Sequence, residues 1–161
     1  MLRNRDPLYD VLAEMETIGP RRKELWRLLQ GRPGEPVEAN RAIVGEAFAA
    51  GFSPVEVGDL AGISHVTAYE MRELWRANDE HKTTDKSFGM IRNLLQMQRG
   101  NREWLTTQYN TVTARMKELV AQAYEMGASI HQIHRHSGVH RPTLNNWLGL
   151  NKARKVRPAQ I

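Results

Sequence analysis

The chain has 161 residues, enough for one large domain or two small ones that each bury a modest core. It carries 23 Lys and Arg against 18 Asp and Glu, a formal net charge of +5, and contains no cysteine. The lack of cysteine excludes a disulfide framework, a thiol nucleophile and a cysteine-based zinc site. The charge is uneven, because residues 1–80 hold 10 basic and 14 acidic side chains whereas residues 81–161 hold 13 and 4. The second half therefore has the positive charge expected of a polyanion binder.

Membrane and enzyme signatures are missing from the sequence. The first ten residues contain charges and a proline where a signal peptide needs an apolar core, and no run of 18 apolar residues occurs. There is no P-loop, no nucleotide-binding glycine fingerprint and no nucleophile motif. We therefore expect a cytoplasmic protein that is not an enzyme, with no membrane contact, no cofactor and no small-molecule ligand.

The first part of the chain is expected to form three helices before any recognisable motif. Proline and glycine set their limits, and Gly19-Pro20 is expected to break the first helix from the second. The predicted helices cover residues 7–16, 21–30 and 36–50.

Residues 52–76 have the spacing of a helix-turn-helix. Ser53 and Glu56 form a capping box that starts a short helix. Gly62 suits the turn, and Ser64 can cap the helix that follows. The residues of this second helix that are expected to face the core recur at spacings of three and four: Ala68, Met71, Leu74 and Trp75.

The order of residue types across this segment resembles the helix-turn-helix of resolvases, invertases and many transposon and phage regulators. The matching positions are Val57, Gly58, Gly62, Ile63, Ser64 and Thr67. The resemblance implies that the second helix reads DNA through its outer side. The residues expected to contact DNA there are Ser64, His65, Val66, Thr67, Tyr69, Glu70, Arg72 and Arg76. Carboxylates on this side repel phosphate, so a role in binding protein stays open.

Beyond this motif, the sequence predicts a linker and a long helix. Residues 77–85 are polar and lack periodicity, which is typical of a linker. Helices are expected over residues 86–100 and 101–126, and the apolar positions of the second step by four and three. If unbroken, this second helix has about 26 residues and a length of about 39 Å. Because heptad spacing is also typical of coiled coils, a dimer through residues 105–126 stays an alternative to a monomer.

The segment after Gly127 repeats the first motif at a shift of 76 positions. The matching pairs include Gly51 and Gly127, Ser53 and Ser129, Gly62 and Gly138, and Thr67 and Thr143. Chance does not readily reproduce these residues at identical intervals, so we expect a second helix-turn-helix over residues 128–149. The copy is imperfect, because His134 replaces Gly58 and His140 replaces the capping Ser64.

The outer side of the second motif carries side chains suited to base edges. An arginine can make two hydrogen bonds to guanine and an asparagine two to adenine. The residues expected to contact DNA here are His140, Arg141, Pro142, Thr143, Asn145 and Asn146. Four basic residues of the tail are expected either to follow the phosphates or to be simply solvated: Lys152, Arg154, Lys155 and Arg157.

A cluster of histidines near this motif raises the alternative of a metal site. Four histidines lie between residues 131 and 140, but no cysteine or acidic ligand accompanies them. Structural zinc sites usually contain sulfur ligands, so we expect no metal and interpret these imidazoles as solvated or phosphate-contacting groups.

Taken together, the sequence predicts an all-α protein of two small helical domains, each ending in a helix-turn-helix. The domains cover residues 1–76 and 86–150, joined by the linker at 77–85 and a long helix, and a basic tail occupies residues 151–161. We expect a sequence-specific regulator of double-stranded DNA, a repressor of the phage immunity or mobile-element kind. Its two reading helices differ, so a monomer should bind an asymmetric site. The alternative is a packaging, replication or partition adaptor with one motif on DNA and the other on a protein.

Overall fold

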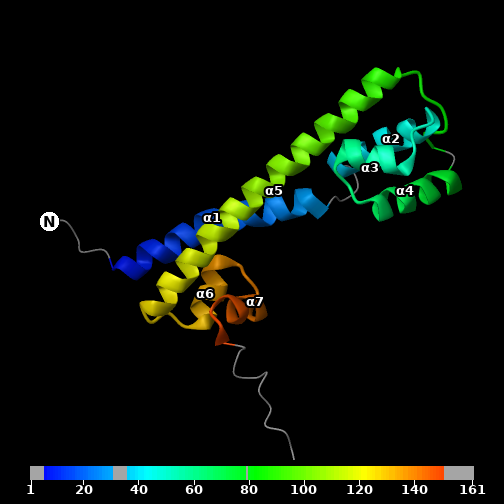
Figure 1. The fold of residues 1–161 in the computed structure, drawn as a ribbon. Coiled ribbons are helices and arrows are strands. Elements are labelled where there is room, and N and C mark those ends of the chain that lie inside the picture. The colour runs from blue at the N-terminus through cyan, green and yellow to red at the C-terminus, as the bar shows by residue number, and fades with distance from the viewer. Residues whose placement is uncertain (1–5, 31–35, 79, 151–161) are drawn as a thin grey trace, which may run out of the picture. The chain divides into compact units, whose positions relative to one another are not determined.

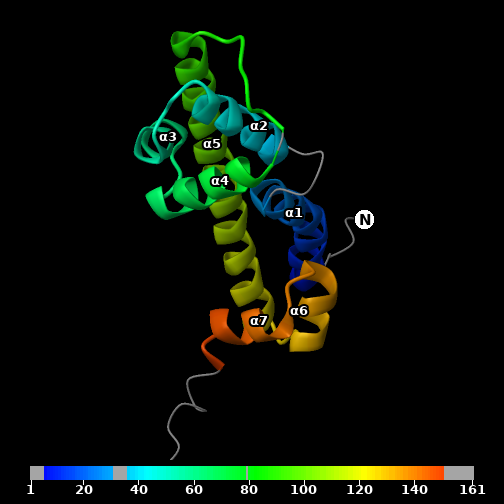
Figure 2. The same cartoon turned by 90° about the vertical axis from the view of Figure 1, so that its right-hand side faces the viewer.

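The computed structural model describes residues 6–30, 36–78 and 80–150. Within these ranges the chain forms seven helices and no strand, so the expected all-α class is confirmed (Figures 1 and 2). The helices are α1 (Pro7–Gln30), α2 (Pro36–Ala49), α3 (Pro54–Ala61), α4 (His65–Ala77), α5 (Phe88–Glu125), α6 (Ile130–Ser137) and α7 (Arg141–Trp147). None of the described helices is long and apolar enough to cross a membrane.

The chain folds into two compact units whose boundaries fall inside helices. Unit 1 consists of residues 1–24 and 109–161, and unit 2 of residues 25–108. Helices α1 and α5 therefore each contribute residues to both units. The expected domain boundary at residues 77–85 differs from this division, because those residues lie within unit 2.

Helix α1 runs through the expected break without interruption. It has 24 residues and contains Pro20, so the prediction of two separate helices is wrong. Pro20 is exposed, whereas Met15 before it and Leu25 after it are buried. Burial of these side chains offsets the roughly 3 kcal/mol that an interior proline costs a helix. Gly19 has a packing role instead, since a Cβ there would lie 2.8 Å from the carbonyl oxygen of Ser137.

Helix α5 is also longer than the sequence predicts. It has 38 residues, so the expected end near Gly100 is wrong. Gly100 is exposed, and a helical glycine costs only about 1 kcal/mol relative to alanine. Fully buried side chains on both sides of it, such as Leu95 and Met116, stabilise the helix by more than that.

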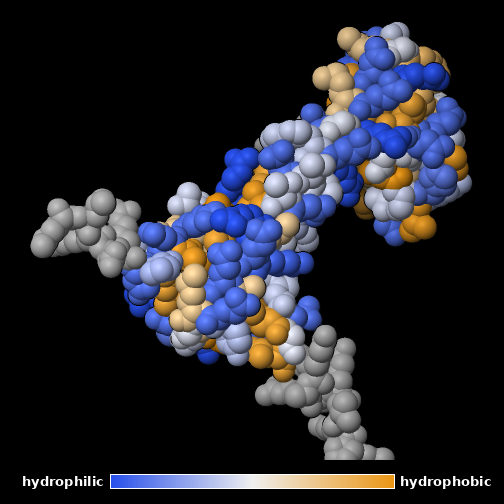
Figure 3. All heavy atoms as spheres, turned by 60° about the vertical axis from the view of Figure 1, so that its left-hand side comes forward, coloured by the Kyte–Doolittle hydropathy of each residue, from blue (hydrophilic) through white to orange (hydrophobic). Residues whose placement is uncertain are grey.

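Each unit has its own hydrophobic core. In unit 1, residues from α1, α5, α6 and α7 meet: Val11, Met15, Met116, Leu119, Val120, Ala123, Ala128, Ile133, Val139 and Leu144. In unit 2, residues from α2, α3 and α5 meet, including Phe48, Val57 and Ile91, with Met71 and Trp75 of α4 packed against them. The face drawn in Figure 3 is mostly hydrophilic with separate hydrophobic patches, as expected when the apolar side chains gather in interior cores.

Three of the heptad positions of α5 take part in the unit 1 core. Met116, Leu119 and Ala123 are at most 1% exposed and pack with Met15 of α1. Their apolar surface is thus already covered by residues of the same chain.

An ion pair joins α1 to α5 within unit 1. Arg115 Nε and Nη2 donate to the two carboxylate oxygens of Glu14 at 2.7 and 2.9 Å. The hydrogen bond from Arg115 lowers the pKa of Glu14 below its usual value, against a smaller opposing effect of burial. A carboxyl group with a lowered pKa in the folded state contributes stability above its unfolded-state pKa and loses it as the pH falls through the folded-state value.

We therefore expect Glu14→Gln to lower the free energy of unfolding at neutral pH and to flatten its decline in acid. The effect is small, because both side chains are more than 40% exposed and water screens the pair. Thermal unfolding followed at a series of pH values measures it. Asp10→Asn, an exposed change on the same helix, serves as the control. Parallel stability curves for Glu14→Gln and the parent would contradict this role of the pair.

Candidate nucleic-acid interface

Two pairs of short helices share the same local construction. In each pair a connection of three residues joins the helices, residues 62–64 between α3 and α4 and residues 138–140 between α6 and α7. The first residue of each connection is a glycine in the left-handed region, with φ of 69° at Gly62 and 70° at Gly138. Glycine adopts this conformation without a Cβ clash, so the turn follows directly from the sequence.

The capping and backbone hydrogen bonds of the two pairs also recur at the shift of 76 residues. Both first helices begin with a complete capping box, Ser53 with Glu56 and Ser129 with Gln132. Three backbone hydrogen bonds of the first pair each have a counterpart in the second. The bond from Phe52 N to Ala47 O matches that from Ala128 N to Ala123 O, and the bond from Val57 N to Ser53 O matches that from Ile133 N to Ser129 O. The bond from Ala68 N to Ser64 O matches that from Leu144 N to His140 O. The residue similarities thus correspond to the same backbone path in both copies.

The two substitutions in the second copy have local consequences. A Cβ at Gly58 would lie 2.8 Å from the His65 ring and 3.0 Å from the Ile63 carbonyl oxygen. At the equivalent position, His134 places its Nδ1 2.7 Å from the carbonyl oxygen of Val139 and hydrogen-bonds there. His140 stands at the N-cap of α7 and makes no side-chain capping bond.

The outer side of α4 carries most of the predicted residues in exposed positions. His65, Val66, Tyr69, Glu70 and Arg76 are exposed. Ser64 and Thr67 are also exposed, but they serve the cap, because Ser64 Oγ accepts from Thr67 N at 3.1 Å and donates to Thr67 Oγ1 at 2.8 Å.

One residue expected in the core lies outside it. Leu74 is 67% exposed, whereas Ala68 is buried and Met71 and Trp75 are partly buried. At 100° per residue, Leu74 lies about 120° around the helix from Ala68. Steps of three residues each turn the helix away from the buried side, so Leu74 no longer faces the core and its prediction is wrong.

Two basic side chains of α4 lie beside acids of the same surface. His65 Nε2 lies 2.9 Å from Asp59 Oδ1, and Arg76 Nη1 lies 3.0 Å from Glu73 Oε1. Arg72 is half-buried, with its guanidinium carbon 5.0 Å from the centre of the Tyr69 ring. Its Nε is buried without a hydrogen-bond partner in the described part of the chain. Helices α3 and α4 together carry two arginines and four acids, so their charge is not positive. The acids are Glu56, Asp59, Glu70 and Glu73.

The outer side of α7 has a different chemistry. His140, Arg141, Pro142 and Asn146 are exposed, Thr143 and Asn145 are half-buried, and Leu144 is fully buried in the unit 1 core. Arg141 Nη2 donates to His131 Nδ1 at 2.7 Å. No acid pairs with Arg141 among residues 6–30, 36–78 and 80–150.

Sequence reasoning missed the role of His131 in this surface. It weighed the imidazole only as a metal ligand or solvated group, whereas here the ring orients a predicted base-reading arginine. An acceptor at Nδ1 requires the neutral ring with its proton on Nε2. The pairing spans ten residues across the α6–α7 connection, and no sequence motif marks it.

Further cations gather near α7 from distant parts of the sequence. The guanidinium of Arg22 and the ammonium of Lys117 lie 5.3 and 5.5 Å from the centre of the Trp147 ring. Lys23 Nζ lies 3.1 Å from the point where Gly138 would carry a Cβ. By sequence, unit 1 holds 13 basic and 7 acidic residues, a balance of +6, and unit 2 holds 10 and 11, a balance of −1. The six excess cations of unit 1 all lie outside the described residues, so the described part of this unit is balanced in charge. They are Arg3, Arg5, Lys152, Arg154, Lys155 and Arg157.

Three of the four clustered histidines have a protein partner. Besides His131 and His134, His136 places its Nδ1 2.6 Å from Glu16 Oε1. The described residues contain no group of three or more His, Cys, Asp and Glu side chains that could hold a metal ion. The tail residues Lys152, Arg154, Lys155 and Arg157 lie outside the described residues.

The candidate interface therefore consists of two similar helix pairs with different outer surfaces, a neutral to acidic one on α4 and a basic one on α7. No protein-family model, curated protein or solved structure matches the chain.

Proposed function

We propose that this protein is a sequence-specific regulator of double-stranded DNA in which α6–α7 is a helix-turn-helix and α7 lies in the major groove. The supporting observation is the outer surface of α7, where Arg141, Asn145 and Asn146 project from a helix anchored by the buried Leu144. These side chain types match guanine and adenine edges, and no acid pairs with Arg141 in the described part of the chain.

The residues around α7 divide into base-reading and phosphate-binding groups. Arg141, oriented by His131, is suited to a guanine, and Asn145 and Asn146 are suited to adenines. Lys23 and Arg135 project beside the same helix pair and are suited to phosphates, which would fix the position of the protein on the duplex.

In the same proposal, α3–α4 is a second helix-turn-helix with a different base preference. Tyr69 and Glu70 stand at the positions of Asn145 and Asn146, so the two readers would favour different half-sites. A single chain then carries both halves of the recognition that symmetric regulators divide between two subunits. Burial of Met116, Leu119 and Ala123 within unit 1 favours a monomer over a dimer seam along α5.

A second candidate function follows from the surface of α4. Arg76 pairs with Glu73, Arg72 lies against the Tyr69 ring, and the exposed fractions of Val66, Tyr69 and Leu74 are 69%, 46% and 67%. Aromatic and aliphatic side chains among compensated charges are typical of a protein-binding surface. On this observation the chain is an adaptor that holds DNA through α7 and a protein through α4. The role as a repressor rests only on the resemblance to phage and transposon regulators.

Selection from random duplexes with the full chain tests the proposal. We expect an asymmetric preferred site and, by light scattering, a complex of one chain per duplex. The full chain is needed because both units contain parts of α1 and α5, and separating the chain at residues 77–85 would remove α5 from α2–α4. A complex of two chains on a palindrome would contradict the monomeric mode.

One further variant distinguishes the regulator from the adaptor. Tyr69→Ala, an exposed change on α4, should alter one part of the selected site if α4 reads bases. An unchanged selected site would favour the adaptor. Tyr9→Ala, an exposed tyrosine of α1, is the matched control and should leave the site unchanged.

A further inference from the structure

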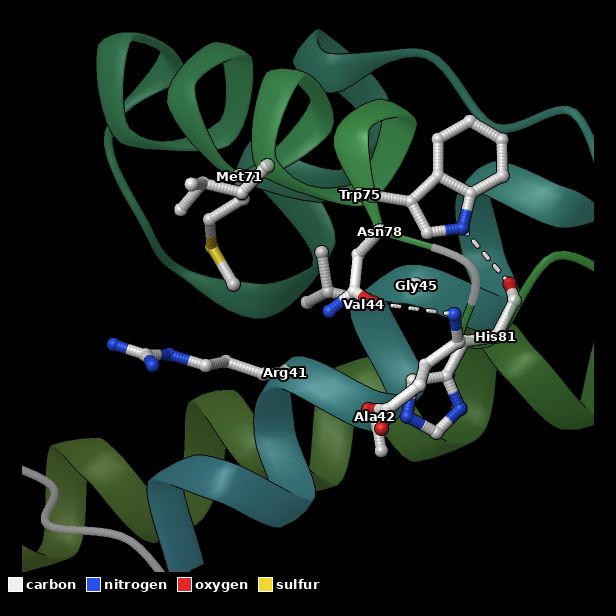
Figure 4. Close-up of a pocket in the computed structure, with 10 residues that line it drawn as sticks. Arg41, Ala42, Val44, Gly45, Met71, Trp75, Asn78 and His81 are labelled. Atoms are coloured by element: carbon white, nitrogen blue, oxygen red, sulfur yellow. Dashed lines mark hydrogen bonds between the residues drawn. The ribbon is translucent and has the colours of Figure 1, made fainter.

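Two adjoining hollows lie in unit 2 beside α4. The first has a volume of about 400 Å³ and is lined by α2, α4 and the loop after α4 (Figure 4). In that loop the carbonyl oxygen of His81 accepts from Trp75 Nε1 at 2.8 Å. The second hollow has a volume of about 340 Å³ and is lined by the end of α1 and by α2, α3, α4 and α5. The two share Arg41, Val44, Met71 and Leu74.

The second hollow combines an apolar lining with a buried amide. Leu28, Ile63 and Leu105 are among its apolar side chains. Gln98 also lines it, is only 8% exposed, and has an Nε2 without a hydrogen-bond partner in the described part of the chain. Buried amides are almost always hydrogen-bonded, and a flip of the Gln98 amide presents either its donor or its acceptor to the hollow. An unpartnered amide in an apolar cavity is thus a ready contact for a polar ligand group.

The charged residues at this hollow favour an anion. Arg41 and Arg102 both line it, both are exposed, and neither has an acidic partner within the ranges that the structure describes. Glu70 is the one acid of the lining, so two arginines and one acid leave a net charge of 2 − 1 = +1. The neighbouring Arg99 is different, because Glu103 Oε1 and the Asp59 carbonyl oxygen both accept from it at 3.0 Å.

We propose that the second hollow binds a small amphipathic carboxylate. Its apolar body occupies the space between α2, α4 and α5, and its carboxylate lies between Arg41 and Arg102, where the Gln98 amide can donate to it. The volume falls within the range of about 300 to 1,000 Å³ that is usual for small-molecule sites. Thr67 and Glu70 of α4 are also part of the lining, so the ligand lies against that helix. Binding itself does not depend on the proposed DNA function.

Octanoate is a suitable probe, and octanol, which lacks the carboxylate, is its matched control. Both are titrated into the full chain without DNA and followed by amide chemical shifts in NMR spectra. We expect octanoate to shift the signals of Gln98, Met71 and Thr67 in a saturable manner. Octanol should bind about tenfold more weakly, because it loses the charge-assisted contacts.

Arg41→Ala combined with Arg102→Ala should reduce octanoate affinity about tenfold or more and bring it near that of octanol. Arg92→Ala removes an exposed arginine of α5 that does not line the hollow, and it should leave the affinity unchanged. Circular dichroism checks that each variant keeps its helices. Equal binding of octanoate and octanol, no saturable shifts at Gln98, or equal effects of the double variant and the control would each overturn the proposal.

Discussion

Replacing Arg141 and Asn145 together by alanine is expected to weaken binding to the preferred duplex by about 2 to 6 kcal/mol. Each side chain can make a pair of hydrogen bonds to one base edge, and such a pair is worth about 1 to 3 kcal/mol of discrimination. The upper end of this range requires the two contacts to add, whereas side chains four residues apart on a helix are neighbours whose effects often do not add fully. Binding to random DNA should fall much less, since phosphate contacts remain. Fluorescence anisotropy at one fixed salt concentration measures both affinities.

The matched control for this experiment is Arg135→Ala. Arg135 is exposed on α6 and is suited to a phosphate, so its loss should weaken specific and random binding alike and reduce the salt dependence. His131→Ala leaves Arg141 in place without its acceptor, so a partial loss of specificity is expected. If the double variant retains full preference for the selected site, α7 is not the reading helix.

Met15→Ala is expected to lower the free energy of unfolding of unit 1 by about 2 to 5 kcal/mol. Met15 is fully buried and packs in the core that α1 shares with α5, α6 and α7. Truncation leaves a cavity where residues from both ends of the chain meet, so the α6–α7 pair should lose support. Urea unfolding followed by NMR signals from each unit measures the loss, and we expect those of Ile133 and Leu144 to disappear at lower urea than in the parent.

Tyr9→Ala provides the control on the same helix. Tyr9 is 64% exposed, so its removal should change the stability by no more than about 0.5 kcal/mol. A loss of stability by Met15→Ala confined to the signals of unit 2 would contradict the described core.

The two helix pairs were predictable because their determinants are local. Each pair is determined within about 15 residues. A capping box starts the first helix, a glycine in the left-handed region forms the turn, and the apolar spacing sets the buried side of the helices. The continuity of α1 and α5 was not predictable in this way. Pro20 and Gly100 carry local signals to end a helix, but side chains buried on both sides outweigh them. Proline and glycine therefore end a helix only where no buried side chains beyond them stabilise its continuation.

The charged surfaces show the same division. The residue types of the outer sides of α4 and α7 follow from helical spacing, so their exposure was mostly predictable. The pairing of His65 with Asp59 and of Arg141 with His131 was not, because each crosses a turn and depends on side chain direction. Lys23 beside Gly138 is 115 residues away in sequence, a separation that no local pattern reports.

The assembly of unit 1 from both ends of the chain has a consequence for synthesis on the ribosome. Residues 1–24 leave the ribosome before their partners in unit 1, which begin only at residue 109, 109 − 24 = 85 residues later. At about 5 to 20 residues per second, α1 waits roughly 4 to 17 s before α5, α6 and α7 can cover Val11 and Met15. Unit 2, whose residues are consecutive, can fold during that interval. A nascent chain therefore exposes Val11 and Met15 of α1 until residues 109–144 have been made, and a chaperone that binds exposed apolar side chains would act on it during that time.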